Sequence, residues 1–150
     1  MKPLILLLAV FAISAGVSQF STGSGHLIFS GNLAMCVMLC LTAFGHFKFT
    51  HGMGMMMPGF VPFKIQLVYL TGVAEILLGF ALLFPSLRHL AGIILVVLFI
   101  LMLPANIHAA IRHINNETAT YDWKGISYLW IRIPMQALFI IWVLFFSIKK

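Results

Sequence analysis

A single carboxylate, Glu75, interrupts the otherwise apolar stretch YLTGVAEILLGFALLF. A lone charge at the centre of a bilayer costs about 2.5 kcal/mol or more, so this carboxylate must be protonated, paired or hydrated. Tyr69, Gly72, Glu75 and Gly79 recur at spacings of three and four, which places them on one face of a helix. The two glycines on that face allow a second helix to approach closely.

Arg132 is the partner that the sequence offers for Glu75. It lies six residues into the apolar segment 126–148, about 9 Å along a helix, and it shares a helix face with Tyr128 and Gln136. Its guanidinium supplies both a countercharge and a fork of five donors. Two interpretations stay open. Glu75 and Arg132 interact directly or through water, or Arg132 reaches the headgroups and Glu75 is a neutral, hydrogen-bonding acid.

Pro104 precedes Asn106 and His108 near the end of another apolar segment. Because proline removes a backbone donor and clashes with the preceding turn, we expect a kink or local unwinding there. In a regular helix His108 points about 200° away from Asn106, so only a distorted helix would turn both toward one pocket. The interpretation of His108 as an interfacial histidine is therefore preferred to that of a ligand.

The elements that position these residues are membrane-spanning helices. Hydrophobic residues make up 62% of the 150-residue chain and charged residues only 8%, far below the roughly 25% charge of a soluble domain. The apolar residues form five runs, none of which alternates with period two: 3–21, 27–47, 64–84, 89–111 and 126–148. Since about 20 apolar residues cross a bilayer as a helix and lipid offers the backbone no partners, the sequence predicts an all-α, polytopic membrane helix bundle.

Successive spans reverse direction, and this brings the polar residues into one half of the membrane. The end of the second span, the start of the third, the end of the fourth and the start of the fifth lie on the same side. We therefore predict one polar pocket that binds a ligand such as a quinone or a lipid headgroup. Its candidate residues are Glu75, Arg132, Asn106 and Gln136, with Tyr69 and His46 at the edge.

Charge and cysteine content narrow the classes of partner. The net charge is +6, but the basic residues separate apolar runs and so indicate headgroup anchors; no nucleic-acid partner is expected. Cys36 and Cys40 lie one helical turn apart in an apolar run, which predicts packing and no disulfide.

The charges also bear on orientation. A cytoplasmic N-terminus would put five basic residues inside and three outside, which weakly favours that orientation. The first group is Lys2, Lys48, Lys64, Arg112 and Lys124, and the second is Arg88, Lys149 and Lys150. The first apolar run, residues 3–21, has the basic start of a signal peptide. It continues through Phe20 with no A-x-A cleavage site, so we expect a retained helix. Cleavage would leave four spans.

The connector between the second and third spans, residues 48–63, is rich in methionine and histidine. Thioethers and imidazoles suit Cu(I), and His51, Met53, Met55, Met56 and Met57 are the right residue types. Flanking phenylalanines and glycine breaks favour a loop that dips into the interface, with methionines as adaptable filler. We expect no metal site. Pro58 and Pro62 predict that no continuous helix crosses the connector, apart from one turn starting near Pro58.

Four segments resemble the DoxX-like family of small membrane proteins: GHF at 45–47, MPGFVPF at 57–63, TGVAEILLGFALLFP at 71–85 and LPANIHAAI at 103–111. The resemblance covers roughly residues 31–148. It implies a DoxX-like four-helix membrane domain at residues 31–150, preceded by an extra transmembrane helix and connector at residues 1–30. The family's motif positions fall here on His46, Pro58, Pro62, Glu75, Pro104 and Asn106.

The resemblance also implies a function and a compartment. Namesakes of the family are associated with a membrane thiosulfate:quinone oxidoreductase and other redox complexes, so it implies an accessory subunit of a quinone-linked complex in a bacterial-type inner membrane. No nucleophile–base pair or cofactor motif accompanies these residues, which leaves open whether the chain is an enzyme. The alternatives are a non-catalytic scaffold or assembly chaperone and, as an oligomer, a small transporter. In each case the partners are the lipid bilayer and a membrane protein or a second copy of the chain.

Overall fold

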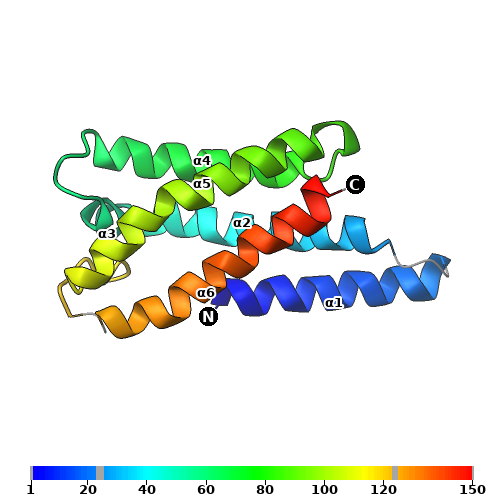
Figure 1. Cartoon of the computed structure of the whole chain (residues 1–150), viewed down its shortest axis with the longest axis horizontal. Helices are drawn as coiled ribbons and strands as arrows, with labels where there is room; N and C mark the ends of the chain where they lie inside the picture. The colour runs from blue at the N-terminus through cyan, green and yellow to red at the C-terminus, as the bar shows by residue number, and fades with distance from the viewer. Residues whose placement is uncertain (1, 23–25, 123–124, 150) are drawn as a thin grey trace.

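The computed structural model describes residues 2–22, 26–122 and 125–149. They form a bundle of long helices whose axes run roughly along one direction (Figure 1). Its elements are α1 (Lys2–Thr22), α2 (Leu27–Lys48), α3 (Thr50–Met56), α4 (Lys64–Ala81), α5 (Pro85–Ile111), α6 (Ile126–Val143) and the π-helix η1 (Leu144–Ile148). Lys124 and Lys150, which enter the charge comparison, and the Tyr128 side chain lie outside the described residues.

Five helical stretches within these ranges are long and apolar enough to cross a membrane. They belong to α1, α2, α4, α5 and the continuous α6–η1 segment. The part of the chain that the structure describes contains no strand; an isolated bridge between Asn115 and Thr120 closes the turn after α5. The prediction of an all-helical bundle is confirmed, and the length and apolar composition of its five long helices indicate a membrane protein.

α2 lies at the centre of the bundle and packs against α1, α4 and η1. Half of its span is buried, whereas only 6% of the α1 span is. The apolar core joins Met35, Met38 and Leu39 of α2 to Leu95 of α5 and Val143 of α6. α1 contributes Leu7 to this core. The remaining spans carry large apolar side chains on their outer faces, as expected of helices that use lipid as their solvent.

The connector between α2 and α4 differs from the prediction in one respect. A helix does form there, but it is α3, which occupies Thr50–Met56 and ends before Pro58. Tertiary packing explains it. Met56 is buried against Ala109 and Ile114, with Met53 and Met55 packed around them. This contact fixes α3 against the end of α5.

Both prolines within the later spans leave the helices continuous. α5 remains helical through Pro104, and α6 through Pro134. The local unwinding expected at Pro104 is therefore absent. Each proline removes one N–H from the helical ladder, and near Pro104 the Gln136 side chain of α6 donates to the carbonyl oxygen of Phe99.

Candidate functional site

Glu75 lies on the face of α4 that packs against α2, where a membrane-embedded polar cluster forms. The cluster consists of Thr42 and His46 on α2 with Val68, Thr71 and Glu75 on α4. His46 is 5% exposed and Glu75 is 2% exposed. Gly72 makes the close approach of the helices possible, because a Cβ atom there would lie 2.9 Å from the Cβ of His46. We call these five residues the His46–Glu75 cluster.

The imidazole of His46 has a defined hydrogen-bonding arrangement. Its Nδ1 lies 3.1 Å from the carbonyl oxygen of Val68 and 3.1 Å from the hydroxyl of Thr71. In the tautomer with its hydrogen on Nδ1, the imidazole donates to the Val68 carbonyl oxygen; in the other tautomer, Nδ1 accepts from the Thr71 hydroxyl. The other ring nitrogen, Nε2, faces Glu75 Oε1 at 3.5 Å.

The tautomer of His46 decides what this contact can hold. With its hydrogen on Nε2, a neutral His46 donates to the Glu75 carboxylate. With its hydrogen on Nδ1, the lone pair of Nε2 would face a negative oxygen, which is repulsive in an apolar medium unless one further proton lies between Nε2 and Oε1. In that protonated form the pair is either imidazolium with carboxylate or imidazole with carboxylic acid, and its net charge is zero.

Thr42 supplies a second hydrogen bond to the Glu75 carboxyl group. Its Oγ1 is 2.8 Å from Glu75 Oε2 and 3.0 Å from the carbonyl oxygen of Leu39. A hydroxyl has one hydrogen, so Thr42 donates to only one of these oxygens at a time. Oε2 carries no hydrogen whether a proton of the His46–Glu75 contact lies on Nε2 or on Oε1, so Thr42 can donate to Oε2 in both forms.

Arg132, the predicted partner of Glu75, lies on α6 and not on the helix that contacts the Glu75 carboxylate. The hydrogen-bond and ion-pair partners of the Glu75 carboxylate among the described residues are Thr42 and His46, both on α2. Arg132 is half-buried on α6, which packs mainly against α5 and η1. A water-mediated interaction between Arg132 and Glu75 stays a prediction.

Asn106 and Gln136 form a second polar contact, between α5 and α6. Asn106 Nδ2 donates to Gln136 Oε1 at 3.2 Å, and Gln136 Nε2 donates to the carbonyl oxygen of Phe99. Both side chains are buried. The sequence placed Asn106 and Gln136 in the same pocket as Glu75; the structure joins them to each other, and Glu75 to His46.

Two further candidates, Tyr69 and His108, take part in neither the His46–Glu75 cluster nor the Asn106–Gln136 contact. Tyr69 is half-exposed on α4, and its ring packs 5.8 Å from that of Phe47. His108 turns toward the connector, where its Nδ1 lies 2.9 Å from the carbonyl oxygen of Met56. Asn106 and His108 thus point to different neighbours, as a regular helix requires.

A third polar contact, at the opposite end of α2, was missed by the sequence analysis. Asn32 is fully buried and donates to the carbonyl oxygens of Ile28 at 2.7 Å and Phe146 at 2.9 Å. Its Oδ1 accepts from Ser147 Oγ at 2.6 Å. These bonds tie α2 to η1, where the widened π-turn makes the Phe146 carbonyl accessible to a side chain. The one signal in the sequence was an amide in the apolar run 27–47.

Metal binding finds no support from the usual ligands. Among residues 2–22, 26–122 and 125–149, no three histidine, cysteine or acidic side chains gather closely enough to hold an ion. Cys36 and Cys40 are free thiols. The connector methionines Met53, Met55 and Met56 pack against Ala105, Ala109 and Ile114, which is a sufficient reason for their presence.

No curated protein and no solved structure matches the chain. A family model does match, over residues 35–147, a stretch that runs from the middle of α2 into η1. It includes the whole His46–Glu75 cluster and the Asn106–Gln136 contact, and it excludes α1. The chain therefore belongs to the family described as a domain of unknown function (DUF8561).

Proposed function

We propose that the chain is an accessory subunit of a quinone-linked redox complex, with the His46–Glu75 cluster as its proton-holding site. The observation that supports this most strongly is the 3.5 Å contact between Nε2 and Oε1 within the membrane-spanning part of the bundle. Quinone reduction takes up protons together with electrons, so a subunit of such a complex needs a buried group that can accept and return a proton.

The proposal extends to architecture and compartment. α2, α4, α5 and α6 correspond to a DoxX-like four-helix core, and α1 is the additional N-terminal helix. The membrane is a bacterial-type inner membrane with the N-terminus on the cytoplasmic side. In that orientation the His46–Glu75 cluster lies in the cytoplasmic half of the bundle, where a cytoplasmic proton source is near.

The test is to purify the full chain in a mild uncharged detergent and to identify bound quinone and co-purifying proteins by mass spectrometry. We expect a retained quinone that is lost in Glu75→Gln. Glu117→Gln is the matched control, because Glu117 is an exposed acid in the connection between α5 and α6. Infrared difference spectra on quinone reduction should contain a carboxylic-acid band that disappears in Glu75→Gln. Preparations without quinone, or equal quinone content in both variants, would contradict the proposal.

A scaffold or assembly factor is the second candidate, and the Asn32 and Gln136 contacts favour it. Each joins two helices through fully paired buried amides, an arrangement that fixes helix position and needs no ligand. A stoichiometric protein partner that co-purifies without quinone, and that remains bound in Glu75→Gln, would support this function over the first.

A further inference from the structure

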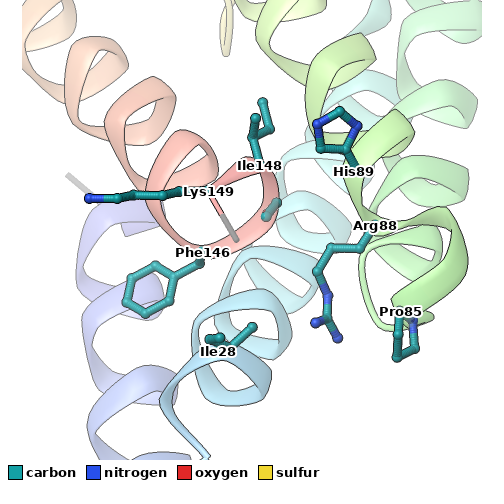
Figure 2. A pocket seen from close by; sticks show the side chains of 8 residues that line it. Ile28, Pro85, Arg88, His89, Phe146, Ile148 and Lys149 are labelled. Carbon is teal, nitrogen blue, oxygen red and sulfur yellow. The ribbon is translucent and has the colours of Figure 1, made fainter.

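Two adjoining hollows lie at the end of the bundle opposite to the His46–Glu75 cluster, where α2 and α5 begin and η1 ends. One has a volume of about 200 Å³ and the other about 510 Å³, and Ile28 and Arg88 line both. Figure 2 shows the Arg88 side chain extending from the start of α5 toward Ile28 on α2. We call the two together the Arg88 hollow.

The charge around the Arg88 hollow is positive and unbalanced. Arg88 and His89 line it from α5, and His26 lines it from the residue before α2. Lys149 stands at its rim, with Nζ turned away over the ring of Phe145 at 5.8 Å (Figure 2). All three acidic residues of the chain lie elsewhere: Glu75 within α4, and Glu117 and Asp122 at the other end of α5. Among the side chains that the structure describes, an anion placed here would meet no like charge.

Arg88 is positioned for an anion by its own backbone neighbourhood. Its Nε donates to the carbonyl oxygen of Leu82 at 3.0 Å, which holds the guanidinium in place. Its two terminal amino groups have no hydrogen-bond partner among the described residues. A planar fork with two adjacent donors matches the geometry of a phosphate group and binds it more strongly than a single charge does.

The remaining walls are apolar, which favours a lipid over a soluble anion. Leu27, Ile28 and Phe29 line the larger part of the hollow and are all about half-exposed. They begin the α2 span, just as Pro85 begins the α5 span, so the hollow lies at the level where headgroups meet acyl chains. A phosphate at Arg88 would therefore have its chains beside apolar side chains.

One wall of the hollow is built by the contact between Asn32 and η1. Phe146, Ser147 and Ile148 of η1 line the smaller part, and Asn32 binds the Phe146 carbonyl oxygen and the Ser147 hydroxyl. The π-turn brings this segment to the wall, and the buried amide keeps it there. The smaller part of the hollow therefore has one wall that buried hydrogen bonds hold in place.

We propose that the Arg88 hollow binds the phosphate of an anionic phospholipid. The basic surroundings disfavour zwitterionic lipids, whose ammonium group would face Arg88 and His89, and favour lipids with net negative charge.

The test uses the full chain in an uncharged detergent, with native mass spectrometry and thermal unfolding as readouts. The probes are phosphatidylglycerol, phosphatidylcholine with the same chains, and inorganic phosphate alone. We expect phosphatidylglycerol to bind about fivefold or more tightly than phosphatidylcholine, the difference that one basic contact supplies. Phosphate alone should have little effect. Equal binding of the two lipids, or phosphate acting as well as phosphatidylglycerol, would overturn the lipid assignment.

Variants locate the site. Arg88→Gln should weaken phosphatidylglycerol binding about tenfold, and Arg88→Lys should restore part of it. Arg112→Gln, at the other end of α5, is the matched control and should bind like the unchanged protein. Equal losses in Arg88→Gln and Arg112→Gln would show general charge attraction and refute the proposal. Should Arg88→Gln fail to fold, Ile28→Trp fills the hollow and leaves Arg88 in place; unchanged lipid binding by that variant would refute the proposal equally.

Discussion

His46 has both ring nitrogens engaged inside the membrane, one with a backbone carbonyl and one with a carboxylate. This double engagement means that the cost of removing Glu75 depends on what replaces it. Glutamine can still accept from Thr42 and can offer its amide N–H to Nε2 of a neutral His46. Leucine leaves the imidazole and the Thr42 hydroxyl facing an apolar side chain.

We therefore expect Glu75→Leu to lower the free energy of unfolding by about 2 kcal/mol and Glu75→Gln by about 1 kcal/mol or less. The measurement is reversible unfolding in detergent micelles. Glu75→Leu combined with His46→Leu should cost less than the sum of the two single changes. Strict additivity would show that the two side chains are satisfied independently. The same cycle with Arg132→Gln tests whether Arg132 interacts with Glu75 through water.

A second residue-scale comparison uses two neighbouring buried polar side chains on α2. Asn32 makes three hydrogen bonds, whereas the Ser30 hydroxyl is buried without a hydrogen-bond partner among the described residues. Asn32→Leu should lower the free energy of unfolding by about 2–3 kcal/mol because it strands the Phe146 carbonyl and the Ser147 hydroxyl. Ser30→Ala should be neutral or stabilising, since it removes an unpaired polar group. Hydrogen exchange and thermal unfolding check both, and a costly Ser30→Ala would contradict the assignment.

At the scale of elements, α2 and α4 approach closely at Gly72, and this approach controls the His46–Glu75 contact. A Cβ atom at Gly72 would lie within 2.9 Å of the His46 Cβ. Gly72→Ala should push the helices apart and destabilise the bundle by about 1–3 kcal/mol. Gly16→Ala on α1 is the control, because a Cβ there meets nothing within 4 Å, and it should be neutral or stabilising. The readouts are unfolding free energy and, for Gly72→Ala, loss of the carboxylic-acid infrared band. Equal effects of the two changes would argue against tight packing at Gly72.

The helices themselves were largely predictable, because apolar run length and proline positions determine where a membrane helix can begin and end. The run at 27–47 became α2 (Leu27–Lys48), and that at 126–148 became α6 with η1. α3 was not predicted, since its stability comes from burying Met56 against α5, a contact between distant segments. The π-turn of η1 was not predicted either, and its hydrogen bonds to Asn32 again join distant segments.

The sequence could not identify which side chain contacts Glu75. Alternating helix direction gives approximate depth, and it predicted that His46, Arg132 and Glu75 lie in the same half of the bundle; the structure joins His46 to Glu75. Depth does not give the order of helices around the bundle. α4 packs against α2 and α5, so the carboxylate meets His46 on α2, which the sequence had assigned only to the edge of the pocket.

At the scale of the whole molecule, the helix order predicts which segments share a membrane side. Ser86 lies at the start of α5, and Thr118 follows its end; both are exposed. In oriented vesicles, Ser86→Cys and Thr118→Cys should react with an impermeant thiol reagent from opposite sides, in a background where Cys36 and Cys40 are replaced by serine. Labelling of both from one side would refute the crossing by α5. A cysteine at the N-terminus should label with Thr118→Cys when α1 also crosses.

The short length of the His46–Glu75 contact has a consequence for the membrane potential. A full elementary charge moved across the bilayer gains about 2.3 kcal/mol per 100 mV. A proton that shifts between Nε2 and Oε1 moves at most the 3.5 Å between them, roughly a tenth of a 30 Å hydrocarbon core. The voltage therefore contributes only about 0.3 kcal/mol to which of the two atoms holds the proton, less than thermal energy. The resting field does not decide between Nε2 and Oε1, and a charged or redox-active neighbour would have to do so.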